Sequence, residues 1–260
     1  MSELGKATRL NRILAFRKRR VLTVAVDHMI NYPLGFPGGL RQMGPTLEKI
    51  VEGEADALTM NKGIAMRYMP PYAGAIPLII QSMALRPGEP DFADTATVEE
   101  VIGLGADAIA VAMFVYCEEE MRFIRHLSEV VRQASVFGLP VIPHIYPLVG
   151  GDERHTVVHD PEHIFYAARV GMEMGADIIK VPYTGDVASF TDIVRSFDAP
   201  IVAAGGPRCA TLEEAEKMTR EIGKTGAAGA TVGRNVWGFE DIPLAIKTLK
   251  QAINKGAQGT

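Results

Sequence analysis

Ala176-Asp177-Ile178-Ile179-Lys180-Val181 begins with a short pattern of small, acidic and apolar residues that recurs along the chain. The pattern returns at Ala55-Asp56-Ala57-Leu58 and Ala106-Asp107-Ala108-Ile109, and in a looser form at Ala228-Gly229-Ala230-Thr231. Each copy precedes or opens a short apolar run, as expected for a strand buried on both faces. The four copies therefore predict four buried strands at equivalent places in a repeated unit.

Four more apolar runs lie before or between these copies. Three of them start with proline, at Pro77-Leu78-Ile79-Ile80, Pro140-Val141-Ile142 and Pro200-Ile201-Val202. Proline is tolerated at the first position of a strand, so these runs also predict strands. The segment from Val21 to Val26 adds another, which makes eight predicted strands.

Helical segments separate the predicted strands. Apolar residues recur at steps of three and four in the segments 97–104, 118–137, 160–175, 188–197, 211–225 and 240–255. Capping boxes are predicted at Thr97 with Glu100 and at Thr211 with Glu214, and Asp160-Pro161 resembles a helix start. Glycine follows four of the segments, as a C-terminal cap would, at Gly105, Gly138, Gly175 and Gly226.

Buried strands that alternate with amphipathic helices predict a parallel sheet covered by helices. Eight such units within 260 residues favour a closed (β/α)8 TIM barrel over a doubly wound sheet. We expect one α/β domain over residues 1–260, with residues 1–20 as a helical lead-in. The basic cluster at 17–20 is interpreted as the solvated end of that lead-in.

The composition favours a small-molecule partner. The formal net charge of −4 gives no general attraction to nucleic acid or to an anionic membrane surface. No apolar run approaches the roughly 18 residues needed to span a membrane. Cys117 and Cys209 match no metal spacing and are too few for a disulfide framework, so a cytoplasmic location is expected.

The active site of a TIM barrel forms at the carboxyl ends of its strands, and those positions are polar in this chain. They include Asp27-His28, Asn61-Lys62, His144, Tyr146, Lys180, Tyr183, Gly205-Gly206 and Gly233-Arg234-Asn235. We therefore expect these side chains to gather around one site.

Lys180 interrupts the apolar run of a predicted buried strand. Lysine is rarely buried without a reason. Burial disfavours a charged amine, and a neutral amine can attack a carbonyl carbon to form a Schiff base. The alternative is a structural ion pair with Asp27 or with an acidic residue of a loop.

Three other residues support the catalytic interpretation. His144 and Tyr146 are two positions apart, so one face of a strand carries both, and Tyr146 could exchange protons with the substrate. Asp27 could orient a substrate hydroxyl or, alternatively, pair with Lys180. His28 and His144 are candidates for substrate binding, although a histidine at a strand end is often only a structural donor.

Two glycine turns after the last two strands predict a phosphate site. Gly205-Gly206 and Gly233-Arg234 follow the seventh and eighth strands, where TIM barrels frequently bind phosphate through backbone N–H groups. Arg234 adds a side chain suited to bidentate contacts with phosphate. Either turn alone is a weak signal, but their shared position favours a phosphorylated substrate.

No metal or cofactor is expected. His155, His159 and His163 are spaced by four, but Asp160-Pro161 marks a helix start between them, so the three cannot share one helix face. Neither a P-loop nor a dinucleotide-binding glycine motif follows the first strand.

Several motifs together resemble the archaeal-type class I fructose-bisphosphate aldolases. They are Val26-Asp27-His28, Tyr146-Pro147, Ala176 to Lys180 with Tyr183-Thr184-Gly185-Asp186, Gly205-Gly206-Pro207 and Val232 to Trp237. This DhnA-like family includes aminodeoxyheptulosonate synthases and a thiolase that processes a phosphorylated autoinducer. The likeness runs from Val21 to about Ala252.

The resemblance implies roles for the same residues. It implies that Lys180 forms the Schiff base, that Tyr146 donates and accepts protons, and that Asp27 holds the substrate. It also implies that the two glycine turns and Arg234 cradle phosphate, and that the protein is a homo-oligomer, in the form of a ring or double ring.

Three positions depart from the family pattern. Met29 replaces a glycine and precedes an unusual loop, Ala204 replaces a serine before Gly205, and Leu148 replaces an arginine after Tyr146-Pro147. The last two changes remove expected contacts with phosphate. The sequence therefore favours a singly phosphorylated or smaller ligand over fructose 1,6-bisphosphate, with an apolar part near Leu148 and Met29.

Three functions follow from these observations. The first is an aldolase that uses a lysine imine for reversible aldol cleavage. The second is a transferase at the same lysine, of thiolase-like or transaldolase-like type. The third is a non-catalytic protein that binds a phosphorylated metabolite, which the altered positions favour and the retention of Lys180, Tyr146 and Asp27 opposes.

Overall fold

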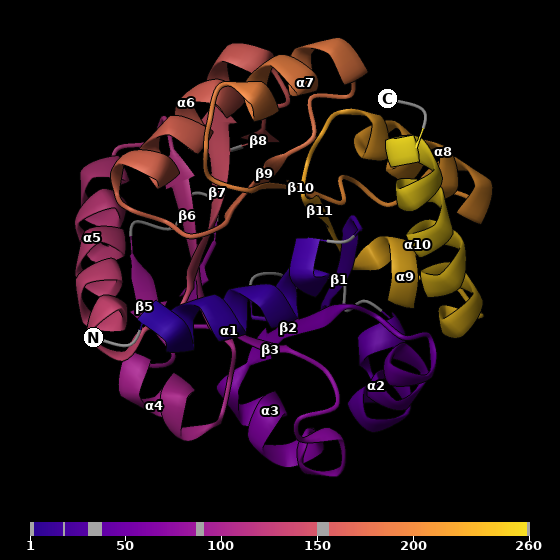
Figure 1. Ribbon diagram of the computed structural model, residues 1–260, viewed down its shortest axis with the longest axis horizontal. Helices are drawn as coiled ribbons and strands as arrows, with labels where there is room; N and C mark the ends of the chain where they lie inside the picture. Colours follow the sequence, from indigo (N-terminus) through magenta and orange to yellow (C-terminus); the bar gives the residue numbers. More distant parts are fainter. Residues whose placement is uncertain (1–2, 18, 31–37, 87–90, 150–155, 259–260) are drawn as a thin grey trace.

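Eight parallel strands form a closed ring in the computed structural model (Figure 1), which describes residues 3–17, 19–30, 38–86, 91–149 and 156–258. In spatial order the ring strands are β6 (Ala108–Val115), β3 (Leu78–Gln81), β2 (Ala57–Asn61), β1 (Val21–Ala25), β11 (Gly229–Val232), β10 (Ile201–Ala204), β9 (Ile179–Pro182) and β7 (Val141–Val149). Pairing of β6 with β7 closes the ring. The predicted (β/α)8 barrel is confirmed.

Helices surround the ring, as the predicted alternation requires (Figure 1). All six predicted helical segments are present, as α4 (Val98–Gly103), α5 (Glu120–Phe137), α6 (Pro161–Glu173), α7 (Val187–Arg195), α8 (Leu212–Lys224) and α10 (Ile242–Gln258). Three others were not predicted: α2 (Met43–Glu52), α3 (Lys62–Tyr68) and the short α9 (Arg234–Trp237). The sequence signal for α2 is weak because Gly44-Pro45 resembles a turn. Proline is nevertheless allowed in the first turn of a helix, which is where Pro45 lies.

The predicted helix ends are largely correct. The capping box at Thr97 is complete, and Asp160 accepts two backbone N–H groups of α6. At Thr211 only half of the box forms, because the Glu214 carboxylate accepts from Ala210 N–H instead of Thr211 N–H. The four predicted capping glycines all have a positive φ: Gly105 69°, Gly138 61°, Gly175 84° and Gly226 87°.

The aspartates of the repeated pattern join neighbouring strands at the amino end of the barrel. Each carboxylate accepts a backbone N–H near the start of the preceding ring strand: Asp56 from Leu22 of β1, Asp107 from Leu78 of β3 and Asp177 from Val141 of β7. Glycine occupies the equivalent place in the fourth copy, because a Cβ at Gly229 would lie 2.2 Å from the Val21 carbonyl oxygen. The pattern therefore has a structural cause that is independent of the active site.

The N-terminal helix α1 (Glu3–Ile13) crosses this same end of the barrel (Figure 1). Lys6 Nζ lies 2.8 Å from Asp177 Oδ1 and Arg12 Nη1 lies 2.9 Å from Asp107 Oδ1. Ile13 is buried in a cluster with apolar side chains of the barrel interior. The helix thus closes the amino end and leaves the carboxyl end open. Within the described ranges, no helix is long and apolar enough to cross a membrane.

Asp107→Ala is expected to lower the free energy of unfolding by about 1–3 kcal/mol, since it leaves the buried Leu78 N–H and the Arg12 guanidinium without their carboxylate. Asp107→Asn should cost less, because an amide oxygen can still accept from Leu78. Urea unfolding of both variants measures the difference. The exposed Asp198 gives a matched control, whose alanine variant should stay within about 0.5 kcal/mol of the parent.

Candidate active site

A cavity of about 340 Å³ opens at the carboxyl ends of the strands. Nine of the thirteen residues expected around the site line it: Asp27, His28, His144, Tyr146, Lys180, Gly205, Gly206, Gly233 and Arg234. The other four, Asn61, Lys62, Tyr183 and Asn235, do not line it. Residues as far apart in the sequence as Asp27 and Arg234 meet here because parallel strands end at the same edge of the barrel. The sequence prediction of the site's location therefore agrees with the cavity.

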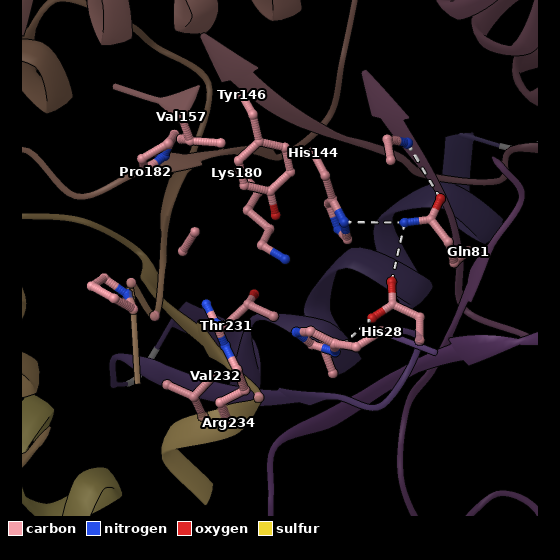
Figure 2. A pocket seen from close by; sticks show the side chains of 18 of the residues that line it. His28, Gln81, His144, Tyr146, Val157, Lys180, Pro182, Thr231, Val232 and Arg234 are labelled. Carbon is pink, nitrogen blue, oxygen red and sulfur yellow. Dashed lines mark hydrogen bonds and ion pairs between the residues drawn. The ribbon is translucent and has the colours of Figure 1, made fainter. Parts of the chain in front are cut away.

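Lys180 lies in the middle of β9 and points into this cavity (Figure 2). Its neighbours Ile179 and Val181 are fully buried on the opposite face, so strand alternation directs Lys180 to the barrel interior. Only 6% of its surface is exposed, and no described residue forms a hydrogen bond or ion pair with its amine. The predicted alternative, an ion pair with Asp27, does not form, so no carboxylate among the described side chains compensates a charge on this amine.

Tyr146 and His144 stand beside Lys180 on the neighbouring strand β7. The Cα atoms of His144 and Lys180 are register partners, and Tyr146 follows two positions later on the same face. Figure 2 shows the Tyr146 hydroxyl and the Lys180 amine pointing into the same space. The Tyr146 hydroxyl has no hydrogen-bond partner among the described residues, which leaves it available to a substrate.

Asp27 follows β1 and is held by a residue that the sequence analysis did not single out. Gln81 Nε2, at the end of β3, lies 3.2 Å from Asp27 Oδ2 and 3.3 Å from His144 Nδ1. Asp27 Oδ1 lies 3.4 Å from His28 Nδ1. Gln81 lines the cavity and is only 2% exposed. A polar residue at the end of a predicted strand was the available signal for it.

His28 packs between the Asp27 carboxylate and the glycine turn after β11. Its ring lies edge-on to Trp237, with 5.3 Å between centroids, and a Cβ at Gly233 would lie 2.5 Å from its Cε1. Burial lowers the pKa of His28, Asp27 partly opposes this effect, and the charges of Lys180 and Arg234 lower the pKa further. His28 is therefore a neutral ring at neutral pH, and Gly233 provides the space for it.

The two glycine turns face each other across the ends of β10 and β11. Gly205 N–H already donates to the Thr231 carbonyl at 2.8 Å, so it is not a free donor, and a Cβ at Gly205 would lie 3.0 Å from the same carbonyl oxygen. Gly206 adopts a φ of 65°. Asn235, which the sequence analysis named only within its turn, donates to the carbonyls of Gly205 and Pro207 at 2.8 and 3.0 Å. Its amide holds the two turns together.

Arg234 reaches the cavity on the side of Lys180 opposite to Tyr146 (Figure 2). It begins the short helix α9 directly after Gly233. Ala204 also lines the cavity here, at the position where the family pattern has serine. This side of the cavity therefore combines a guanidinium with backbone of low steric demand, which suits an anionic group.

The apolar part of the cavity differs from the prediction. Leu148 is 2% exposed and lies in the hydrophobic core, and its backbone pairs with Val157 of β8 (Thr156–Val157). Met29 packs against the core and does not line the cavity. The predicted contacts of a ligand with these two residues are wrong. Leu85, Phe114 and Val157 form the apolar wall instead.

The histidine series 155, 159 and 163 forms no shared ligand set. His159 Nδ1 lies 2.7 Å from the Tyr183 carbonyl oxygen, and His163 Nδ1 lies 2.8 Å from Asp160 Oδ1. His155 lies outside the described residues, and so do residues 31–37 of the unusual loop 31–39. Within the described part of the chain, no three His, Cys, Asp or Glu side chains are arranged to hold a metal ion.

Residues 21–238 match the sequence profile of the DeoC/LacD family aldolases. The chain belongs to this aldolase family. The match contains every residue of the site described above, from Asp27 after β1 to Arg234 after β11. The predicted resemblance to class I aldolases is thereby confirmed.

Two archaeal relatives match this aldolase family member over nearly its whole length. The class 1 fructose-bisphosphate aldolase of Thermoproteus tenax is 32% identical over 94% of this chain and 93% of its own. The 2-amino-3,7-dideoxy-D-threo-hept-6-ulosonate synthase of Halobacterium salinarum is 34% identical over 91% of this chain and 87% of its own. Family membership therefore leaves more than one substrate open.

Solved structures agree with the fold. The crystal structure of an archaeal fructose 1,6-bisphosphate aldolase superposes with a TM-score of 0.84 at 29% identity, over 96% of this chain and 99% of its own. A related structure, with the same TM-score and 28% identity, is described as having its catalytic lysine covalently bound to the carbinolamine intermediate of the substrate, with 96% and 99% of the two chains covered. This aldolase family member therefore has the same barrel fold as these two structures.

Proposed function

We propose that this protein is a class I aldolase in which Lys180 forms a Schiff base and a carbon–carbon bond of a small, singly phosphorylated carbonyl compound is cleaved or formed. The observation that carries the proposal is the Lys180 amine, which is 6% exposed, points into the cavity and has no partner among the described residues. Such an amine is available as a nucleophile because no counter-ion holds its charge.

The proposed reaction needs one nucleophilic amine, water and a group that transfers protons. The neutral Lys180 amine adds to the carbonyl carbon, and the carbinolamine so formed takes up a proton and loses its oxygen as water, which leaves a protonated imine. When the adjacent carbon–carbon bond breaks, the imine accepts the electron pair and becomes an enamine. The β-hydroxyl group loses its proton and becomes an aldehyde. Protonation of the enamine carbon and addition of water then release the second product and restore the amine.

Tyr146 is the group best placed for these proton transfers. Its hydroxyl points into the same space as the Lys180 amine and has no hydrogen-bond partner in the described parts of the chain. A positioned acid or base of this kind contributes about 10²–10⁴-fold to a rate. Asp27, fixed by Gln81, would accept a hydrogen bond from a substrate hydroxyl.

The two sides of the cavity support a substrate with one phosphate. Arg234 and the glycine turns favour an anion on one side. Leu85, Phe114 and Val157 form an apolar wall elsewhere in the cavity. Lys180 and Arg234 are the only lysine and arginine side chains that line it among the described residues. A compound with a second phosphate would therefore lack a second arginine contact within this lining.

Borohydride trapping tests the proposal directly. The protein is incubated with a panel of singly and doubly phosphorylated ketoses and aldehydes, treated with borohydride, digested and analysed by mass spectrometry. We expect a covalent adduct on the peptide that contains Lys180, with singly phosphorylated compounds as the better donors. Binding of a compound without an adduct or turnover would contradict the aldolase proposal and favour a binding protein.

Arg234→Ala is expected to raise KM for the phosphorylated substrate about 10–100-fold, because hydrogen bonds to charged groups are worth about 1.5–3 kcal/mol. Steady-state kinetics with the phosphorylated compound and with its dephosphorylated analogue measure the effect. The analogue should lose little on substitution. Arg234→Lys is the matched control, which keeps the charge but not the bidentate fork and should give an intermediate KM. An equal loss for both compounds would argue against a phosphate contact.

A transferase is the second candidate, and the 34% identity to a relative named as a synthase favours it. In this reaction the enamine on Lys180 would not take up a proton but would add to the carbonyl carbon of a second compound. Turnover would then require the acceptor, whereas aldol cleavage would proceed without one. Product analysis with and without added aldehydes or coenzyme A distinguishes the two. The predicted ring or double ring of subunits stays a prediction.

A further inference from the structure

Gln81 has its amide orientation fixed by backbone donors. Its Oε1 accepts from Met83 N–H and from Ala112 N–H, both at 3.3 Å. A backbone N–H can only donate, so the amide oxygen must face these two groups. The amide nitrogen therefore faces the other way, toward Asp27 Oδ2 and His144 Nδ1 (Figure 2).

This orientation determines which nitrogen of His144 carries the proton. The two protons of the Gln81 amide are directed to two acceptors, the Asp27 carboxylate at 3.2 Å and His144 Nδ1 at 3.3 Å. If Nδ1 carried a proton, two N–H groups would face each other. The imidazole proton therefore belongs on Nε2, the nitrogen that Gln81 does not contact.

The surroundings of His144 also keep its ring neutral. Burial lowers the pKa of His144 well below its ordinary value, and the repulsion from Lys180 and His28 when they are protonated lowers it further. The groups that face it from the neighbouring elements are Lys180 on β9, Gln81 on β3, and Asp27 with His28 after β1. Asp27 does not offset this effect through a direct contact, because the Gln81 amide lies between the carboxylate and the ring.

We propose that Gln81 is a positioning residue that holds His144 as the neutral Nε2–H tautomer, so that His144 presents a permanent hydrogen-bond donor to a substrate oxygen beside Lys180. The substrate contact rests on the proposed Schiff-base function, whereas the tautomer does not. His144 lines the cavity and is the register partner of Lys180. An oxygen on or next to the carbon that bonds to Lys180 is therefore within its reach.

A neutral donor has a chemical advantage at this position. The imine on Lys180 carries a positive charge when protonated, and a second cation on the adjacent strand would destabilise it. A neutral Nε2–H can polarise a carbonyl or hold a hydroxyl without this repulsion. It also does not compete for protons at neutral pH, so proton exchange is left to Tyr146.

Nitrogen NMR of the histidine rings tests the tautomer in the whole protein. With 15N-labelled imidazole groups and His144→Gln for assignment, we expect His144 to show a protonated Nε2 and an unprotonated Nδ1, with no titration between pH 8 and pH 5.5. A protonated Nδ1, or protonation of His144 within that range, would overturn the proposal.

Two variants test whether Gln81 is the cause. Gln81→Glu keeps the acceptor for Met83 and Ala112 but turns an acceptor toward His144 Nδ1, so Nδ1 should become protonated and the pH–rate profile should gain a new ionisation. Gln81→Met removes the donor with little change in length, and both tautomers should then appear. A wild-type tautomer in either folded variant would overturn the positioning role.

The same preparations separate this inference from the proposed function. If borohydride trapping labels Lys180 but His144 has a protonated Nδ1, only the role of Gln81 is wrong. If the tautomer is as expected but no adduct forms with any carbonyl compound, the Schiff-base function is wrong, and with it the substrate contact proposed for His144.

Discussion

Lys180→Met is expected to lower kcat/KM by at least about 10⁴-fold and to abolish borohydride trapping, because methionine has a similar length but no nucleophile. The residual activity should not be rescued by a change of pH, since no other amine lines the cavity among the described residues. Steady-state kinetics and mass spectrometry of the trapped peptide measure both effects.

The same variant should fold normally. The amine of Lys180 is 6% exposed and has no ion pair or hydrogen bond with the described residues, so its removal leaves no buried partner unsatisfied. Its thermal midpoint should equal or exceed that of the parent. An active Lys180→Met enzyme would refute the Schiff-base mechanism, and a strong loss of stability would assign Lys180 a structural role.

The location of the site was predictable from the sequence because a parallel barrel imposes it. Asp27 follows an apolar run, Tyr146 and Lys180 interrupt theirs, and the carboxyl ends of parallel strands share one edge. Strand alternation correctly placed His144 and Tyr146 on one face. These are local rules, and they work because each depends only on the spacing within one strand.

Gln81 could not be assigned a role from the sequence. Its orientation depends on the Ala112 N–H, 31 residues away on β6, and its partners Asp27 and His144 come from two other elements. Such a network exists only after the ring closes. Gly205 is a similar case, because the bond from its N–H to the Thr231 carbonyl depends on the pairing of the last two strands.

Leu148 shows where a local rule fails. It follows His144 and Tyr146 at the same spacing, so alternation directs it toward the cavity side of β7. Leu148 is nevertheless buried in the hydrophobic core, its backbone pairs with Val157 of the short antiparallel strand β8, and Val157 lines the cavity. No periodic pattern marks a strand as short as Thr156–Val157, so its pairing with Leu148 was not predictable.

The family pattern and the structure point to different residues as the determinants of substrate choice. The resemblance to the aldolase family implies an arginine at position 148, but the side chain that lines the cavity next to this position is Val157 of β8. Variants that alter specificity should be sought at Val157, Leu85 and Phe114, which line the apolar wall.

Tyr146→Phe is expected to lower kcat by about 10²–10⁴-fold, because it removes only the group that exchanges protons with the substrate. The Lys180 amine is unchanged, so the imine should still form, although loss of water from the carbinolamine should also be slower without the Tyr146 hydroxyl. Borohydride should therefore trap an adduct on Lys180 in a variant that turns over slowly. Rapid-quench trapping combined with steady-state kinetics separates the two steps.

Tyr183→Phe is the matched control for this experiment. The Tyr183 hydroxyl is buried without a partner among the described residues, burial raises the pKa of Tyr183 to about 12, and its side chain does not line the cavity. Removal of that hydroxyl should leave kcat unchanged and should not reduce stability, because an unsatisfied buried polar group costs free energy. Both variants lose one phenolic oxygen, so a loss of activity in Tyr146→Phe alone would be due to the position of that hydroxyl in the cavity.

Full activity of Tyr146→Phe would contradict the proposed role of Tyr146, because the proton would then have to pass through another group. Asp27, which the Gln81 amide holds at the cavity wall, would be the residue to test next.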